Sequence, residues 1–178
     1  MHITKYNRKI SEKRKHRILI FLGTYSKRGI TKACFSQWFP FKFEEEGIEY
    51  KTAEHYMMAG KAKLFNDDKI LEEILKSETP NQANSLGRKV KNFDSKIWDE
   101  QKYEIVKRAN FLKFSQNQKF KDFLLSTNNK ILVEASPYDT VWGIGMLETD
   151  SKAQNPSFWN GENLLGFALM EVRDLLKE

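Results

Sequence analysis

The stretch TAEHYMMAGKAKLF, residues 52–65, has the spacing of a helix that carries two charges on its apolar side. At about 100° per residue, Glu54 and Lys61 lie on the same side as the apolar residues, whereas Lys63 lies opposite. Helical side chains lean toward the N-terminus, so we expect Lys61 to reach back toward Glu54. Charges are rarely buried unless they are paired or used. This helix is therefore the first place to look for chemistry.

Working outward from this helix, the chain alternates short strands with amphipathic helices. The predicted strands are 17–24, a hairpin around Gly47, and 131–136, and the other predicted helices are 68–76, 80–88, 94–114, 118–125 and 163–176. No repeat, low-complexity tract or internal linker interrupts this order. The sequence therefore predicts a single α+β domain, mostly helical, with a small β-sheet.

Size and composition indicate a folded cytosolic protein. The chain has 178 residues, of which 40% are hydrophobic and 13% aromatic, enough for a substantial core. No apolar run has the length of a membrane span or the place of a signal peptide, so no membrane partner is expected. The single cysteine, Cys34, cannot form an internal disulfide, which fits a reducing cytoplasm, although a disulfide-free extracellular protein would look the same.

The positive charge of the chain is concentrated at its start. The formal net charge is +6, and residues 1–17 contain seven Lys or Arg and one acid, whereas the remainder holds 23 bases and 23 acids. We therefore divide the chain into a basic arm, 1–17, and a domain, 18–178. Such an arm can contact the phosphate backbone of a nucleic acid, or it can be a frayed, solubilising terminus.

Several reaction classes are excluded by the residues that are missing. Only His55 lies outside the arm among three histidines, and there is one cysteine, so no His- or Cys-based metal centre can form. No glycine-rich phosphate loop and no GxSxG nucleophile motif is present. No metal or cofactor is expected. Carboxylate, lysine, aromatic and amide chemistry remains, which is the set that glycosidic bond cleavage uses.

Glu54 and Lys61 fit that chemistry, although a structural interpretation also stands. Glu54 can stabilise positive charge on a sugar or direct a water, and a desolvated Lys61 can act on C1, even through an imine. Alternatively, Glu54 is a glutamate favoured in a first helical turn, and Lys61 extends from the edge of the core. The spacing alone leaves both interpretations open.

The segment EASPYDTVWGIG, residues 134–145, has the composition of a loop that lines a pocket. Here Asp139 can hold a ribose hydroxyl, Trp142 can stack on a base, and the glycines allow close approach of the backbone to a ligand. The alternative is a tight turn in which the aspartate caps and the tryptophan packs.

Two further segments offer candidate binding residues. CFSQWF, residues 34–39, can supply a stacking wall for a base or can form a satellite hydrophobic cluster. WNGENLLG, residues 159–166, opens the last helix, where an N-terminus with asparagine suits an anion or hydroxyl, or simple capping. Arg88 can bind a phosphate, although an arginine at a helix end is commonly solvated.

Together these segments resemble the YbiA/NADAR family of N-glycosidases. The resemblance rests on an ordered set of motifs: ACFSQWFP (33–40), YKTAEHYMMAGKAKLF (50–65), LGRKV (86–90), KF (113–114), LVEASPYDTVWGIG (132–145) and WNGENLLGFALMEVR (159–173). The set covers nearly everything after the arm, which has no counterpart in it. The expected fold is accordingly YbiA-like.

The resemblance implies a soluble, metal-independent hydrolase that cuts the N-glycosidic bond between a ribose and a base. Its members act on phosphoribosyl-aminopyrimidine intermediates of riboflavin biosynthesis or remove ADP-ribose from guanine in nucleic acid. It implies Glu54 as catalytic carboxylate and Lys61 as the helix lysine. The implied substrate-binding residues are Phe35, Trp38, His55, Arg88, Glu134, Asp139, Trp142, Gly143 and Asn163.

One departure bears on the substrate. The SNF signature of the riboflavin-linked branch is FSQWF here, at residues 35–39. This departure and the basic arm both favour ADP-ribosylated guanine. The alternatives are the riboflavin intermediates and a non-catalytic ADP-ribose or nucleotide reader.

Overall fold

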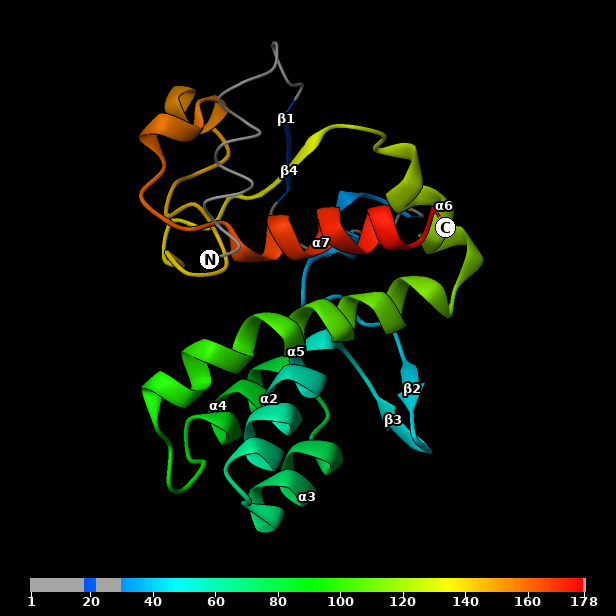
Figure 1. Cartoon of the computed structure of the whole chain (residues 1–178), viewed down its shortest axis with the longest axis vertical. Coiled ribbons are helices and arrows are strands. Elements are labelled where there is room, and N and C mark those ends of the chain that lie inside the picture. Colours follow the sequence, from blue (N-terminus) through cyan, green and yellow to red (C-terminus); the bar gives the residue numbers. More distant parts are fainter. Residues whose placement is uncertain (1–17, 22–29, 178) are drawn as a thin grey trace.

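The computed structural model describes residues 18–21 and 30–177, and the basic arm lies outside this part of the chain. Helices dominate the described residues, and short strands accompany them (Figure 1). The elements are β1 (Ile18–Phe21), η1 (Lys32–Phe35), β2 (Phe43–Glu45), β3 (Ile48–Tyr50), α2 (Ala53–Leu64), α3 (Asp68–Lys76), α4 (Pro80–Gly87), α5 (Ser95–Ser115), α6 (Gln118–Ser126), β4 (Ile131–Glu134), η2 (Ser151–Gln154), η3 (Pro156–Phe158) and α7 (Leu164–Leu175).

Helix α2, the opening stretch of the sequence analysis, packs against three other helices. It begins after Thr52, whose side chain accepts a hydrogen bond from the backbone N–H of His55. It contacts α3, α4 and α5, so most of its surface is covered. Its buried residues are mostly apolar but include Glu54 and His55. This burial is what gives charged residues on α2 their unusual environment.

Helix α5 lies between two parts of the molecule, with α2, α3 and α4 on one side and α7 on the other (Figure 1). Its N-terminus is capped by Asp94, which accepts from the backbone N–H groups of Lys96 and Ile97. Helix α7 also packs on β4. Residues 36–38, α2 and the end of β4 are thereby held around a common interior.

The strands form two separate two-stranded sheets. β1 and β4 run parallel, with Ile18 opposite Ile131 and Phe21 opposite Glu134. β2 and β3 form an antiparallel hairpin whose turn uses the positive φ of Gly47. The two sheets are built differently. The strands of the hairpin are neighbours in the chain, whereas β1 and β4 are separated in the chain by helices α2 to α6.

The predicted fold class, a single mostly helical α+β domain with little sheet, is confirmed. The predicted helices are all present, with bounds within a few residues of those expected. Of the predicted first strand, 17–24, only Ile18–Phe21 falls within the described residues. In that part of the chain no helix combines the length and the apolar character needed to cross a membrane.

Candidate active site

A cavity of about 400 Å³ lies where four separate segments of the chain meet. It falls within the ~300–1,000 Å³ range typical of small-molecule sites. The segments are the loop after η1, the first turns of α2, the end of β4 with its following loop, and the start of α7. The lining residues are Ser36, Gln37, Trp38, Glu54, Met57, Glu134, Ser136, Asp139, Trp142 and Leu165. The structure thus brings Trp38, Glu54, Glu134, Asp139 and Trp142 of the predicted site into one pocket.

The position of Glu54 is set by the start of α2. The cap by Thr52 fixes the first turn, and the backbone N–H of Glu54 donates to the carbonyl of Gln37 at 3.0 Å. This bond joins α2 to the loop after η1. The Glu54 side chain is consequently enclosed, with only 2% of its surface exposed.

The protonation of Glu54 is balanced by its surroundings. Burial raises its pKa, hydrogen bonds from Asn84 and Trp38 lower it, and the charge of Asp139 raises it further, giving a pKa of about 7. The Asn84 Nδ2 donates to Glu54 Oε1 at 2.7 Å. Near neutral pH, Glu54 is therefore present both as a carboxylate and as an acid, as general acid–base and charge-stabilising groups require.

A second buried carboxyl, Glu134, stands at the end of β4. It is 8% exposed, and its pKa rises to about 8, first because of burial and then because of the charge of Asp139. Asp139 itself anchors the loop, since its Oδ1 accepts from the backbone N–H groups of Val141 at 2.9 Å and Trp142 at 2.8 Å. Three carboxyl groups in one pocket favour a ligand that develops positive charge.

Gly143 and Asn163 support the pocket from behind. A Cβ atom at Gly143 would lie 2.9 Å from the Glu134 carbonyl oxygen and 3.0 Å from that of Asp139, so only glycine fits. Asn163 has a φ of 56°, and its Oδ1 accepts from the Glu134 N–H at 3.0 Å while its Nδ2 donates to the Leu132 carbonyl at 3.0 Å. Both residues position Glu134, and neither is among the residues that line the cavity.

Two tryptophans supply the aromatic surface of the pocket. Trp38 is 45% exposed, which is unusual for so large an apolar side chain, and Trp142 is half-buried. Exposed aromatic rings beside buried carboxyls suit a ligand with a planar ring and a polar end.

Two of the predicted binding residues lie in the protein interior instead. Phe35 is fully buried, with its ring centroid 5.4 Å from that of Phe21, as expected for the hydrophobic-cluster interpretation. His55 is also buried, and its ring contacts Thr52 Oγ1 at 2.8 Å and the Ser77 carbonyl at 3.2 Å. Both stabilise the walls around the cavity, and a role in binding stays a prediction.

Lys61 and Arg88 lie outside the lining of the cavity. The Lys61 ammonium sits 4.1 Å from the ring centroid of Phe93 and 5.6 Å from that of Trp98. Burial, and then the charge of Arg88, lower the pKa of Lys61. Arg88 is exposed, and its charge also lowers the pKa of Glu54. The catalytic role of Lys61 and the phosphate-binding role of Arg88 stay predictions.

Sequence reasoning missed three polar residues that build the pocket. Gln37 lines it, Asn84 donates to Glu54, and Lys113 is fully buried with its Nζ donating to the Ser36 carbonyl at 2.8 Å. Burial lowers the pKa of Lys113 to about 8. Lys113 could have been found by the signal that singled out Glu54, a charge within an apolar helical stripe. Asn84 carries no such signal, because it is one of several polar residues in its helix.

The pocket carboxyls do not form a metal site. Within the described residues no group of three or more His, Cys, Asp or Glu side chains is arranged to hold a metal ion.

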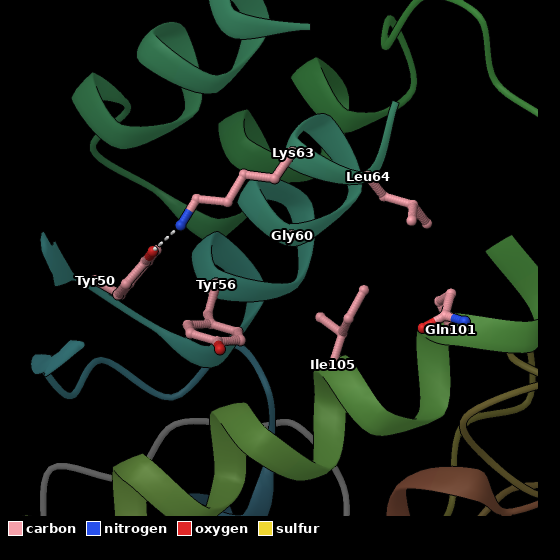
Figure 2. A pocket seen from close by; sticks show the side chains of 7 residues that line it. All are labelled: Tyr50, Tyr56, Gly60, Lys63, Leu64, Gln101 and Ile105. Atoms are coloured by element: carbon pink, nitrogen blue, oxygen red, sulfur yellow. Dashed lines mark hydrogen bonds between the residues drawn. The ribbon is translucent and has the colours of Figure 1, made fainter. Parts of the chain in front are cut away.

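A second cavity, of about 370 Å³, lies beside the other side of α2 (Figure 2). Three of its polar groups are paired: Lys63 Nζ donates to the Tyr50 hydroxyl at 3.2 Å, and the Tyr56 hydroxyl donates to Glu45 Oε2 at 2.6 Å. The lining residues are Tyr50, Tyr56, Gly60, Lys63, Leu64, Gln101 and Ile105. No pair of buried carboxyls faces this cavity, so the first cavity is the candidate active site.

Comparison with known proteins agrees with this choice. The NADAR domain family model matches residues 24–177. An N-glycosidase of Acanthamoeba polyphaga mimivirus is 46% identical over 145 residues, covering 79% of this chain and 85% of that protein. N-glycosidase YbiA of Escherichia coli is 32% identical over 142 residues, covering 80% of each protein. The solution NMR structure of E. coli YbiA superposes with a TM-score of 0.71 at 30% identity, covering 90% of this chain and 86% of that one.

Proposed function

Because this chain belongs to the NADAR domain family and shares the N-glycosidase class of its relatives, we propose that it hydrolyses the bond between a ribose and a base, with ADP-ribosylated guanine as its preferred substrate. The observation that carries the proposal is Glu54, a buried carboxyl with a pKa of about 7 in a pocket lined by two further carboxyls. The base would belong to a nucleic acid or a free nucleotide.

Glu54 is proposed to stabilise the reacting carbon. As the bond between C1 and the base nitrogen breaks, C1 gains positive charge, and a carboxylate in a water-poor pocket stabilises that charge strongly. The hydrogen bond from Asn84 keeps the carboxylate oriented. A water then adds to C1 and gives one proton to Glu54, and the leaving base nitrogen takes up one proton, from Lys61 or from Glu54, so that no net proton is gained or lost.

Trp38, Trp142 and Asp139 are proposed to hold the substrate. The two tryptophans line the cavity and offer stacking surfaces for the base. Asp139 uses Oδ1 to order its loop, so its other oxygen is available to a ribose hydroxyl. Substrate phosphates would lie outside this acidic pocket, on the side of Arg88.

Lys61 has two candidate roles, transient imine formation with a ring-opened sugar or protonation of the leaving group. Its lowered pKa supports either, provided that its amine leaves Phe93 when substrate binds. Borohydride reduction during turnover separates the two. A covalent adduct that Lys61→Arg abolishes supports the imine, and turnover without any adduct supports proton transfer.

The preference for ADP-ribosylated guanine rests on FSQWF at residues 35–39 and on the basic arm. Turnover should be compared on an ADP-ribosyl-guanine oligonucleotide and on a phosphoribosyl-aminopyrimidine, with Glu54→Gln as the inactive control. Faster release from guanine is expected. Faster turnover of the aminopyrimidine would assign the riboflavin-linked reaction, and tight binding of ADP-ribose without turnover of either substrate would make the protein a reader.

The basic arm, residues 1–17, is proposed to contact nucleic acid, in a cytosolic setting. Deleting it should weaken binding of an oligonucleotide substrate, more at low salt than at high salt, and spare cleavage of a small substrate. Equal oligonucleotide affinity with and without the arm would contradict this contact.

A further inference from the structure

Two buried polar atoms of the candidate active site have no hydrogen-bond partner within residues 18–21 and 30–177: Gln37 Nε2 and Glu134 Oε2. Gln37 is 6% exposed and Glu134 is 8% exposed, and both line the same cavity. Buried polar groups in folded proteins are nearly always paired. Asn110 Oδ1 is unpaired among the described residues as well, but Gln37 and Glu134 line the cavity, where a bound ligand can supply the missing partners.

The orientation of the Gln37 amide follows from its neighbours on α5. Asn110 Nδ2 donates to the Val106 carbonyl at 2.9 Å, and a carbonyl can only accept, so the NH2 group of Asn110 must face it. The same Nδ2 donates to Gln37 Oε1 at 2.8 Å. Gln37 therefore turns its oxygen to Asn110 and keeps its NH2 group as an unused donor.

The backbone of Gln37 is fixed as well. Its carbonyl accepts from the Glu54 N–H at 3.0 Å, and the preceding carbonyl, of Ser36, accepts from Lys113 at 2.8 Å. A donor held by its side chain and its backbone, and linked directly to the residue proposed to act on C1, is pre-organised for reading a substrate.

Glu134 supplies the complementary group. A carboxyl group accepts a hydrogen bond from an N–H through either oxygen when it is ionised and through its C=O oxygen when it is protonated. A cavity that offers one donor and one acceptor matches a ring carbonyl next to a ring N–H, the lactam edge of a base. Guanine has this edge and adenine does not.

Building on the proposed function, we propose that Gln37 and Glu134 read the lactam edge of the base, with Gln37 donating to its carbonyl oxygen and Glu134 accepting from its ring N–H. This makes Gln37 a specificity-determining residue. The pocket rejects bases that lack the edge, because they leave both buried groups unpaired.

The test compares ADP-ribosylated guanine with the same substrate built on 2-aminopurine, which lacks the carbonyl oxygen and the ring N–H. We expect the wild-type protein to favour guanine in kcat/KM by at least roughly ten- to hundredfold. Gln37→Glu keeps the oxygen that Asn110 contacts and replaces the amide donor by a carboxyl oxygen, and Gln37→Met serves as the uncharged counterpart. Gln37→Met removes both groups at similar length. Both variants should lose most of the preference, by slowing guanine turnover more than 2-aminopurine turnover.

Gln101→Met is the matched control, because Gln101 lines the second cavity, and it should keep the wild-type preference. An unchanged preference in Gln37→Glu, or an equal loss on both substrates, overturns base reading and leaves Gln37 a structural residue. If the wild-type protein hydrolyses neither substrate, the proposed function fails. In that case calorimetry measures the affinity of the wild-type protein and of the Gln37 variants for the guanine and 2-aminopurine compounds. A preference for guanine that the Gln37 variants lose supports base reading, and an unchanged preference contradicts it.

Discussion

The two cavities beside α2 are similar in size and differ in how their polar groups are satisfied. One measures about 400 Å³ and the other about 370 Å³. Beside Glu54, buried atoms of Gln37 and Glu134 find no partner among the described residues. Beside Tyr56, the tyrosine hydroxyl donates to Glu45, and Lys63 donates to the Tyr50 hydroxyl, as Figure 2 shows for the second pair. Cavity volume therefore does not distinguish the candidate active site from the second cavity, whereas the presence of unpaired buried polar atoms does.

The physical reason is the cost of leaving polar groups buried and unpaired. Each such group costs roughly 1–3 kcal/mol, and a ligand bound in the active-site cavity would recover that cost for Gln37 and Glu134. The second cavity carries no such cost, because Tyr56, Glu45 and Arg108 form a linked set in which Arg108 Nε lies 2.7 Å from Glu45. This set joins α2, the hairpin and α5 and serves stability.

The largest expected contrast between the cavities is in catalysis. Glu54→Gln removes the negative charge and keeps an oxygen that can accept from Asn84, so kcat should fall roughly 10²–10⁴-fold with the fold intact. Tyr56→Phe, its counterpart in the second cavity, should retain near wild-type kcat and lose about 1 kcal/mol of stability. Steady-state turnover and urea unfolding measure the two effects. Near-normal turnover of Glu54→Gln would break the assignment.

A glycine in each region gives the next contrast. Gly143→Ala brings a Cβ to 2.9 Å from a backbone oxygen of Glu134, so the wall of the active site must shift, and kcat/KM should fall by roughly tenfold or more. Gly60→Ala meets the Ile105 side chain at 2.8 Å and should reduce stability only. Kinetics and thermal unfolding of both variants check this. Equal loss of activity in the two would contradict the division between the cavities.

The two buried carboxyls of the active site should make stability fall as pH rises. The pKa of Glu54 rises from 4.5 to about 7 and that of Glu134 from 4.5 to about 8. Through these two groups the folded protein binds more protons than the unfolded chain between about pH 4.5 and 8, so their contribution to stability is greatest at the acid end and is lost across this window, whereas the lowered pKa values of His55 and Lys113 act in the opposite sense. The contribution of Glu54 is on the order of 3 kcal/mol.

Urea unfolding from pH 5 to 9 measures this slope, and both Glu54→Gln and Glu134→Gln should flatten it. Tyr56→Phe should leave the slope as it is in the wild-type protein. The same slope in the wild-type protein and in both carboxyl variants would show that the two carboxyls are not held in their neutral form.

The smallest predicted effect concerns the pH dependence of turnover. Activity should increase as Glu54 ionises near pH 7, and the negative charge of Asp139 delays that ionisation. Asp139→Asn keeps an oxygen for the N–H groups of Val141 and Trp142 and removes the charge, so the midpoint should move to lower pH. A pH profile of kcat/KM measures it. A midpoint that stays in place or moves upward would exclude this charge coupling.

The sequence predicted the helices well because their signals are local. Thr52, Thr79 and Asp94 each cap the helix that follows, as expected from residue type alone. The charge of Glu54 on the apolar side of the predicted helix correctly indicated an enclosed carboxyl, whereas Tyr56, which the same angles place on the opposite side, is buried as well because three helices cover α2.

Prediction of the site was less complete because contacts across the fold have no local signal. The helical angle placed Lys61 on the side of Glu54, yet the Lys61 amine lies over the ring of Phe93, from a different segment. Asn84 reaches Glu54 only because α4 packs against α2. A helical wheel gives direction around one axis, and the partner met in that direction depends on every other element.

By itself, the sequence determined the order of elements, the burial of an acid at the start of α2, and the family of the chain. These follow from periodicity, caps and ordered motifs, which act over a few residues. Only the tertiary structure decided that Gln37, Glu54 and Glu134 share a cavity and that Asn110 orients the Gln37 amide. Those residues lie far apart in the chain, and their contacts exist only once α2, α5 and β4 have packed together.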